Sequence, residues 1–254
     1  MAHPDPRASL VLGADVGGSS IKLGLVDRVT GRIAGPTERV VTPRPATPEA
    51  VIGEIESAAT RLGWTGPVGV AVPAVVRDGR THSAANIDPS WIGADIAGLC
   101  RERLHVESVV INDADAAGIA ELRLGAARGV SGTCLLLTLG TGIGSALFTG
   151  GVLVPNTEFG HILINNEIAE KRASAAAKVR DDIDYPTWAG RLQHYLAHMV
   201  ALLSPDVLVL GGGISADADQ WLPLLDLTTE IRIAELRNDA GLVGAALAVP
   251  DQQS

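Results

Sequence analysis

The stretch LVLGADVGGSSIKLGLV, residues 10–26, decides the fold. Two apolar runs flank a turn that contains Gly17, Gly18 and Ser19, which predicts a β-hairpin. Further along the chain, CLLLTLGTGIGSALF, residues 134–148, repeats the pattern of apolar strand, glycine-rich turn and second strand. The repetition predicts two related lobes with a cleft between them.

Strands alternate with helices along the chain, which predicts an α/β architecture. Further strands are expected at 32–41, 68–72, 108–111 and 207–210, and helices at 48–62, 114–123, 188–203 and 241–249. We assign residues 1–112 plus 241–254 to a small N-terminal lobe and 113–240 to a large C-terminal lobe.

The composition excludes several classes of protein. Of 254 residues, 46% are hydrophobic and 19% charged, so the chain can bury a large core. A net charge of -9 with 3% aromatic residues argues against a nucleic-acid partner. The longest apolar stretches are interrupted, the N-terminus lacks signal-peptide features, and only two cysteines are present. We therefore expect a cytoplasmic protein with no membrane partner.

The first glycine turn carries groups suited to phosphate. Asp15, Gly17, Gly18, Ser19, Ser20 and Lys22 combine a carboxylate, two residues without Cβ, hydroxyls and a cation. Glycine lets backbone N–H groups approach an anion closely, and Asp15 is a candidate Mg²⁺ ligand. The alternative is a type I′ or II′ hairpin with a polar tip.

Two more glycine clusters follow strands. Gly140, Thr141, Gly142 and Gly144 form a second candidate anion nest, whose spacing matches neither the dinucleotide fingerprint nor a Walker loop. The run Gly211, Gly212 and Gly213 offers a surface without side chains for a nucleotide base; the alternative is a flexible turn.

Acidic residues stand between a strand and a helix at Asn112-Asp113-Ala114-Asp115. Either aspartate is a candidate helix N-cap, but both cannot cap one helix. The other is then available as a general base for a substrate hydroxyl.

Polar residues suited to a sugar lie in two places. Glu158 and His161 stand three residues apart, and Asn86 and Asp88 precede Trp91. For His161, a metal ligand or a structural histidine is the alternative. His194 and His198 have the spacing of metal ligands on a helix, but the sequence offers no third ligand nearby. This favours a solvated helix face.

A basic run breaks the acidic background: Lys171, Arg172, Lys178 and Arg180 lie within ten residues. A solvated helix face is one interpretation. A binding strip for a long polyanion is the other.

Taken in order, these motifs resemble the ROK sugar kinases of the actin/hexokinase superfamily over essentially the whole chain. The segments NIDPSWIG (86–93), NDADAAGIAE (112–121), PNTEFGH (155–161) and ELRNDAG (235–241) are most similar to the polyphosphate glucokinases of that family.

The resemblance implies a two-lobed actin-like ATPase fold and phosphoryl transfer to the 6-hydroxyl of glucose, from inorganic polyphosphate and also from ATP, with Mg²⁺. It implies that Asp113 is the base, that Gly211–Ser215 lies at the adenosine site, and that a homodimer forms. The glucose-binding residues it implies are Asn86, Asn112, Asp113, Glu158, His161 and Glu170.

Two departures from the family pattern matter. Ordinary ROK kinases carry a cysteine-rich zinc motif between the positions of His161 and Glu170, and residues 162–169 here contain no cysteine, so no structural zinc is expected. Ala74 stands where many relatives have glycine.

Three alternatives stay open beside this hypothesis. One is an ATP-dependent hexokinase for glucose or mannose that does not use polyphosphate, and another is a non-catalytic sugar sensor. A ROK repressor is disfavoured, because a helix-turn-helix module of about 60 to 80 residues is expected before the first strand, and nine residues precede it.

Overall fold

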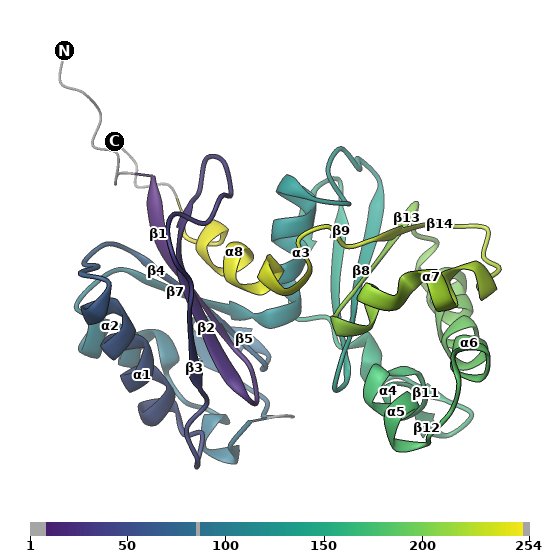
Figure 1. The fold of residues 1–254 in the computed structure, drawn as a ribbon, viewed down its shortest axis with the longest axis horizontal. Helices are drawn as coiled ribbons and strands as arrows, with labels where there is room; N and C mark the ends of the chain where they lie inside the picture. Colours follow the sequence, from purple (N-terminus) through teal and green to yellow (C-terminus); the bar gives the residue numbers. More distant parts are fainter. Residues whose placement is uncertain (1–8, 85–86, 251–254) are drawn as a thin grey trace. The chain divides into compact units, whose positions relative to one another are not determined.

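The computed structural model describes residues 9–84 and 87–250 (Figure 1). Its contacts divide the chain into two compact units, Met1–Ala120 with Asp239–Ser254 and Glu121–Asn238. The division falls inside helix α3 (Asp113–Leu124), later in the chain than the boundary expected from the sequence.

The first unit is built on a five-stranded mixed sheet with the order β3-β2-β1-β4-β7. The hairpin strand β1 is antiparallel to β2 and parallel to β4, which is parallel to β7. The bounds are β1 (Leu10–Val16), β2 (Ser20–Asp27), β3 (Glu38–Val41), β4 (Val68–Val72) and β7 (Ser108–Asn112). The strand expected at 32–41 is shortened to β3, because Gly35 adopts a φ of +91° and Pro36 follows it.

Helices cover both faces of this sheet. On one face lie α1 (Pro48–Arg61) and α2 (Ile96–Leu104), whose apolar residues join the same core as β1 and β4. The predicted cap of α1 is confirmed, since the Thr47 hydroxyl accepts a hydrogen bond from the Ala50 N–H at 3.3 Å. The short elements of this unit are β5 (Val76–Arg77), β6 (Arg80–Thr81) and the 3₁₀ turn η1 (Pro89–Trp91).

On the other face, α8 (Ala240–Leu247) lies directly against the strands (Figure 1). A Cβ atom added at Gly13 would collide with the Leu242 carbonyl, and one at Gly69 with the Ala245 carbonyl. These two glycines therefore set how closely α8 approaches β1 and β4. Gly244 in turn brings α8 against the backbone of Ala116 in α3.

The second unit has its own five-stranded sheet, with the order β10-β9-β8-β13-β14. Its strands are β8 (Thr133–Leu139), β9 (Ile143–Thr149), β10 (Val152–Val154), β13 (Val207–Gly211) and β14 (Glu230–Ile233). Residues Trp188, Tyr195 and Trp221 are fully buried in the core on one face.

Helices and small elements complete the second unit. The helices are α4 (Glu170–Ala173), α5 (Ala175–Arg180), α6 (Tyr185–Leu203) and α7 (Ala218–Trp221). The small elements are β11 (Leu163–Ile164), β12 (Glu167–Ile168), η2 (Phe159–His161), η3 (Gly213–Asp217) and η4 (Leu222–Leu224); η5 (Arg237–Asp239) leads into α8.

The two sheets share one topology. When the strands of each sheet are numbered in chain order, both read 3-2-1-4-5, and both begin with a glycine-turn hairpin. This confirms the duplication predicted from the repeated hairpin. None of the helices in the described part of the chain combines the length and apolar character needed to cross a membrane.

Candidate active site

The first glycine turn is anchored through its carbonyl groups. Gly17 accepts a hydrogen bond from the Thr42 hydroxyl at 2.6 Å, Gly18 from the Arg44 guanidinium at 2.9 Å, and Ser19 from the Thr42 N–H at 3.1 Å. Within the described residues, no hydrogen bond uses the N–H of Gly18 or Ser19. These two N–H groups are therefore available to an anion.

The backbone of this turn excludes the plain hairpin alternative. Types I′ and II′ need a positive φ at their central positions. Among the described residues with positive φ, none lies between Gly17 and Ser20. The first loop closes instead with a hydrogen bond of 3.0 Å from the Gly17 N–H to the Ser20 carbonyl.

Asp15 occupies a tight position near the end of β1. Its carboxylate lies 2.7 Å from where a Cβ of Gly241 would stand, at the start of α8. Burial raises the pKa of Asp15 to about 6, although Lys22 and Arg39 pull it downward. Lys22, which pairs with Asp15 across the hairpin, forms an ion pair with Asp239. Asp15 thus offers a half-buried carboxylate whose charged form is disfavoured by burial, and carboxylate oxygens are the donors that a hard cation such as Mg²⁺ prefers.

Asp113 begins helix α3 at the end of β7. The helix is capped by neither aspartate but by Asn112, whose Oδ1 accepts the N–H groups of Ala114 at 2.9 Å and Asp115 at 3.0 Å. The Asn112 Nδ2 donates to the Ala74 carbonyl at 3.2 Å, and the residue is buried. Asp113 accepts a hydrogen bond from the Ala114 N–H at 2.8 Å, which orients its carboxylate.

These residues meet at one edge of the first sheet. Strands β1, β4 and β7 are parallel, so their carboxyl ends, which carry Asp15 and Asp113, lie on the same edge. In open α/β sheets, ligands bind at this edge. Asn86 falls outside the described residues, and Asp88 caps η1 by accepting the Ser90 N–H at 2.9 Å.

The second glycine turn is joined to the start of α4. The Gly140 N–H donates to the Gly142 carbonyl at 3.0 Å, which closes a loop of three residues between β8 and β9. A Cβ at Gly142 would collide with the carboxylate of Glu170, which accepts the Ile143 N–H at 3.0 Å. Both hairpins have three residues between their strands, but the first hairpin closes with the pair Val16–Ile21 and the second with the pair Leu139–Ile143.

Glu170 also belongs to a cluster of ionisable side chains. The His161 ring lies between two carboxylates, with Nδ1 3.5 Å from Glu158 Oε2 and Nε2 3.4 Å from Glu170 Oε1. All three side chains are partly exposed, so they are accessible to a ligand. Burial raises the pKa of Glu158; the nearby Glu170 adds to this rise and His161 opposes it. Two carboxylates that accept hydrogen bonds, with an imidazole between them, suit the hydroxyl groups of a sugar.

The third glycine cluster lies beside the second. Gly212 has a φ of +87°, and a Cβ there would collide with the backbone of Leu139, immediately before Gly140. Since β13 is parallel to β8, both glycine turns lie at one edge of the second sheet. A Cβ at Gly213 would meet nothing within 4 Å, which leaves open surface there.

The chain is similar to known proteins over most of its length. Residues 11–174 match the ROK family. The chain belongs to the ROK family. A protein named polyphosphate glucokinase from Mycobacterium tuberculosis (strain CDC 1551 / Oshkosh) is 46% identical over 93% of this chain and 89% of its own length.

Two solved structures share the fold of this ROK chain. The inorganic polyphosphate/ATP-glucomannokinase from Arthrobacter sp. strain KM has a TM-score of 0.90 and 48% identity, covering 94% of this chain and 97% of its own. A ROK family glucokinase from Streptomyces griseus, in complex with glucose and AMPPNP, has a TM-score of 0.81 and 27% identity, covering 93% and 98%. The duplicated α/β architecture is therefore the actin-like fold of ROK sugar kinases.

One segment of this ROK protein differs from the pattern described for ordinary family members. Residues 162–169, which contain no cysteine, form the small hairpin β11–β12, and Asn165 and Asn166 both adopt positive φ at its turn. The hairpin connects His161 to Glu170 and so places both beside each other.

Sequence reasoning missed two residues of the first unit. Asp239 pairs with Lys22 across 217 positions, and Gly241 makes room for the Asp15 carboxylate. The only sequence signal was the Asn-Asp-Ala-Gly segment at 238–241, which contributed to the family resemblance without a role for either residue.

Proposed function

We propose that this ROK protein transfers the terminal phosphoryl group of inorganic polyphosphate, and also of ATP, to the 6-hydroxyl of glucose. The observation that carries the proposal is similarity at 46–48% identity over more than nine-tenths of the chain to two proteins whose names state polyphosphate use. The product is glucose 6-phosphate, and the donor chain leaves one phosphate shorter.

Asp113 is proposed as the general base. Its carboxylate takes the proton of the 6-hydroxyl as that oxygen bonds to the terminal phosphorus, and the bond to the penultimate phosphate breaks. A helix N-terminus favours the anionic carboxylate, and the Ala114 N–H holds its orientation. Because phosphoryl transfer has a loose transition state, alignment and charge neutralisation contribute most of the rate.

Three side chains of the second unit are proposed to bind the sugar. Glu158 and Glu170 accept hydrogen bonds from ring hydroxyls, and His161 between them bridges to a third. The Asn112 amide already caps α3 and donates to the Ala74 carbonyl. We therefore propose that Asn112 positions Asp113. Asn86 completes the proposed set.

Each of the two glycine turns is proposed as a phosphate-binding site of its own unit. The N–H groups around Gly18 and Gly142 and the Lys22 ammonium neutralise phosphate oxygens, and Gly211–Gly213 accommodates the adenine of ATP. Mg²⁺ fits beside Asp15, whose carboxylate has its pKa raised by burial although Lys22 and Arg39 lower it. When bound, the ion would neutralise charge on the phosphate chain.

Mannose is a second candidate acceptor. The Arthrobacter relative is named a glucomannokinase. A comparison of kcat/KM for glucose and mannose with one donor tests whether the sugar pocket discriminates at the 2-hydroxyl.

A homodimer and a cytoplasmic location belong to the same proposal. Both cysteines, Cys100 and Cys134, are buried free thiols, which suits a reducing compartment. Light scattering coupled to size-exclusion chromatography tests the dimer.

The deciding assay supplies glucose and long-chain polyphosphate in nucleotide-free buffer with Mg²⁺ and measures glucose 6-phosphate. Product is expected. Product with ATP alone would assign the protein to the ATP-dependent hexokinases, and no product with either donor would favour the sugar sensor.

A further inference from the structure

Four cations gather on one side of the second unit. Lys171 and Arg172 lie on α4, Arg180 at the end of α5, and Arg191 on α6; we call this group the basic face. It stands out because the whole chain carries a net charge of -9.

The cations of the basic face are tied together by hydrogen bonds. The Arg180 guanidinium donates to the Lys171 carbonyl at 2.6 Å and to Asp181 Oδ1 at 2.8 Å. Arg191 donates to the other oxygen of the same carboxylate. These bonds lower the pKa of Asp181 to about 2. One carboxylate thus holds two guanidinium groups close to each other.

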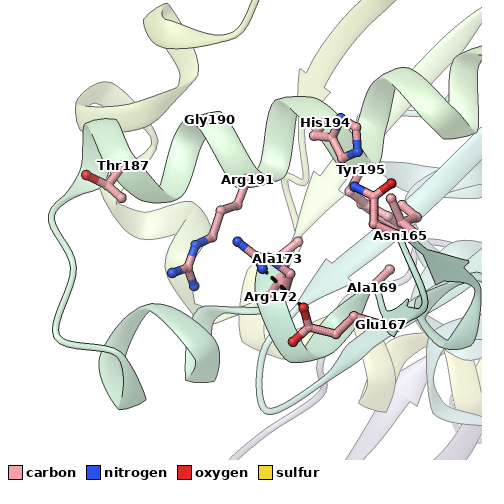
Figure 2. A pocket seen from close by; sticks show the side chains of 11 residues that line it. Asn165, Glu167, Ala169, Arg172, Ala173, Thr187, Gly190, Arg191, His194 and Tyr195 are labelled. Carbon is pink, nitrogen blue, oxygen red and sulfur yellow. Dashed lines mark hydrogen bonds and ion pairs between the residues drawn. The ribbon is translucent and has the colours of Figure 1, made fainter.

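A pocket of about 610 Å³ opens beside this face (Figure 2). Arg172 from α4 and Arg191 from α6 line it, with His194, Thr187 and Asn165. Arg172 is paired with Glu167 at 3.1 Å, but both side chains are about half exposed. The lining also includes the Glu167 carboxylate, whose charge Arg172 compensates, while the remaining guanidinium, hydroxyl and amide groups suit phosphate oxygens.

The basic face is fastened to the second glycine turn. The Ala176 N–H of α5 donates to the Gly140 carbonyl at 3.0 Å. Glu170, which contacts Gly142, directly precedes Lys171 in α4. A chain of phosphates that leaves the turn therefore meets α4 and α5 next.

We propose that long-chain polyphosphate extends from the second glycine turn across the basic face, and that a distal segment of the chain enters the pocket between α4 and α6. This subsite rests on the proposed function. Cations spaced along a surface suit a polyanion with many phosphates. In this proposal the shorter triphosphate of ATP ends at the second glycine turn and does not reach the basic face.

Lys178 is excluded from this subsite, although it belongs to the same basic run in the sequence. Its Nζ lies 4.3 Å from the centroid of the Tyr185 ring, in a cation–π contact. The Tyr185 hydroxyl in turn donates to Asp217 at 2.7 Å.

The test compares two triple variants of the full chain. The first triple variant removes three positive charges from the basic face and the pocket, by Lys171→Gln, Arg172→Gln and Arg191→Gln. The control triple variant removes the same charge from exposed positions on α1 and α2, by Arg61→Gln, Arg101→Gln and Arg103→Gln. The KM values for long-chain polyphosphate, tripolyphosphate and ATP are measured at several salt concentrations. Equilibrium binding of long-chain polyphosphate is measured without glucose.

For the first variant, we expect the KM and the dissociation constant for long-chain polyphosphate to rise on the order of tenfold. The slope of log KM against log salt should fall by about 2, since each cation on a single-stranded polyanion contributes about 0.7. Values for tripolyphosphate and ATP should stay within about twofold, and the control triple variant should match the wild type.

An equal loss with all three donors, or an unchanged KM for long-chain polyphosphate, would overturn the subsite. If the triple variant does not fold, the single variants Lys171→Gln and Arg191→Gln decide by the same donor comparison. If the wild type makes no product from polyphosphate, the proposed function fails; if it does and the variants match the control, only the subsite fails.

Discussion

Gly142 and Glu170 lie in direct contact: the Glu170 carboxylate occupies the space that a side chain at position 142 would need. The same carboxylate accepts the Ile143 N–H and approaches His161. A glycine of the proposed phosphate loop therefore also fixes a proposed sugar ligand.

The variant Gly142→Ala should weaken glucose binding. The new methyl group displaces Glu170, and a misplacement of about 1 Å can cost on the order of a hundredfold in rate. We expect the dissociation constant for glucose, measured by calorimetry without donor, to rise at least about tenfold. Gly140→Ala is the matched control for glucose affinity, because its methyl group meets nothing within 4 Å. Equal affinities in the two variants would refute the role of this contact.

The closeness of α8 to the first sheet predicts a stability effect at Gly69. A methyl group there collides with the Ala245 backbone, which cannot move aside as a flexible side chain can. Gly69→Ala should lower the free energy of unfolding by about 1–3 kcal/mol or more. Gly53→Ala, on α1 with only the Arg103 guanidinium at 3.4 Å, should instead stabilise by roughly 0.5–1 kcal/mol. Denaturant unfolding of both variants measures the difference; a tolerated alanine at 69 would contradict the close packing.

The raised pKa of Asp15 predicts that its ionisation lowers the free energy of unfolding in a pH-dependent way. Its pKa of about 6 in the folded state exceeds the value of about 3.9 in an unfolded chain. The folded state therefore binds the proton more tightly, and the penalty grows as pH rises from about 4 to 6 and is complete above that. The shift corresponds to at most about 3 kcal/mol, and partial exposure reduces it.

Asp15→Asn should accordingly be more stable than the wild type at pH 8, by roughly 1–2 kcal/mol, and lose that advantage near pH 4. It should also lose most Mg²⁺-dependent activity. Thermal or urea unfolding across this pH range checks the first expectation. A variant that is destabilised at pH 8 would show that the Asp15 charge is well compensated in the fold.

Local sequence patterns predicted most helices and strands correctly. Thr47 and Pro48 start α1 and Gly63, with a φ of +58°, follows its end, because caps depend on neighbouring residues alone. The repeated hairpins likewise marked both sheets. The shorter β3 shows the limit, since Gly35 and Pro36 outweigh the apolar residues around them.

Contacts between distant residues could not be predicted in the same way. The Lys22–Asp239 pair and the contact of Gly241 with Asp15 depend on how α8 returns to β1 from the far end of the chain. From the sequence, the two candidates for the N-cap of α3 were Asp113 and Asp115. In the structure Asn112 is the N-cap, and Asp113 is the first residue of the helix. Side-chain competition of this kind is decided by the backbone geometry at the end of β7.

The most direct test of the account is the turnover of Asp113→Asn. The amide keeps the shape of the side chain and an acceptor for the Ala114 N–H, but it cannot take a proton. Asp95→Asn is the control, because Asp95 also begins a helix, where it accepts the Gly98 N–H at 2.8 Å. We predict that kcat of Asp113→Asn falls by about 10²- to 10⁴-fold with either donor, with glucose affinity nearly unchanged and the control like the wild type. A kcat close to that of the wild type would contradict the account, because phosphoryl transfer would then proceed without this base.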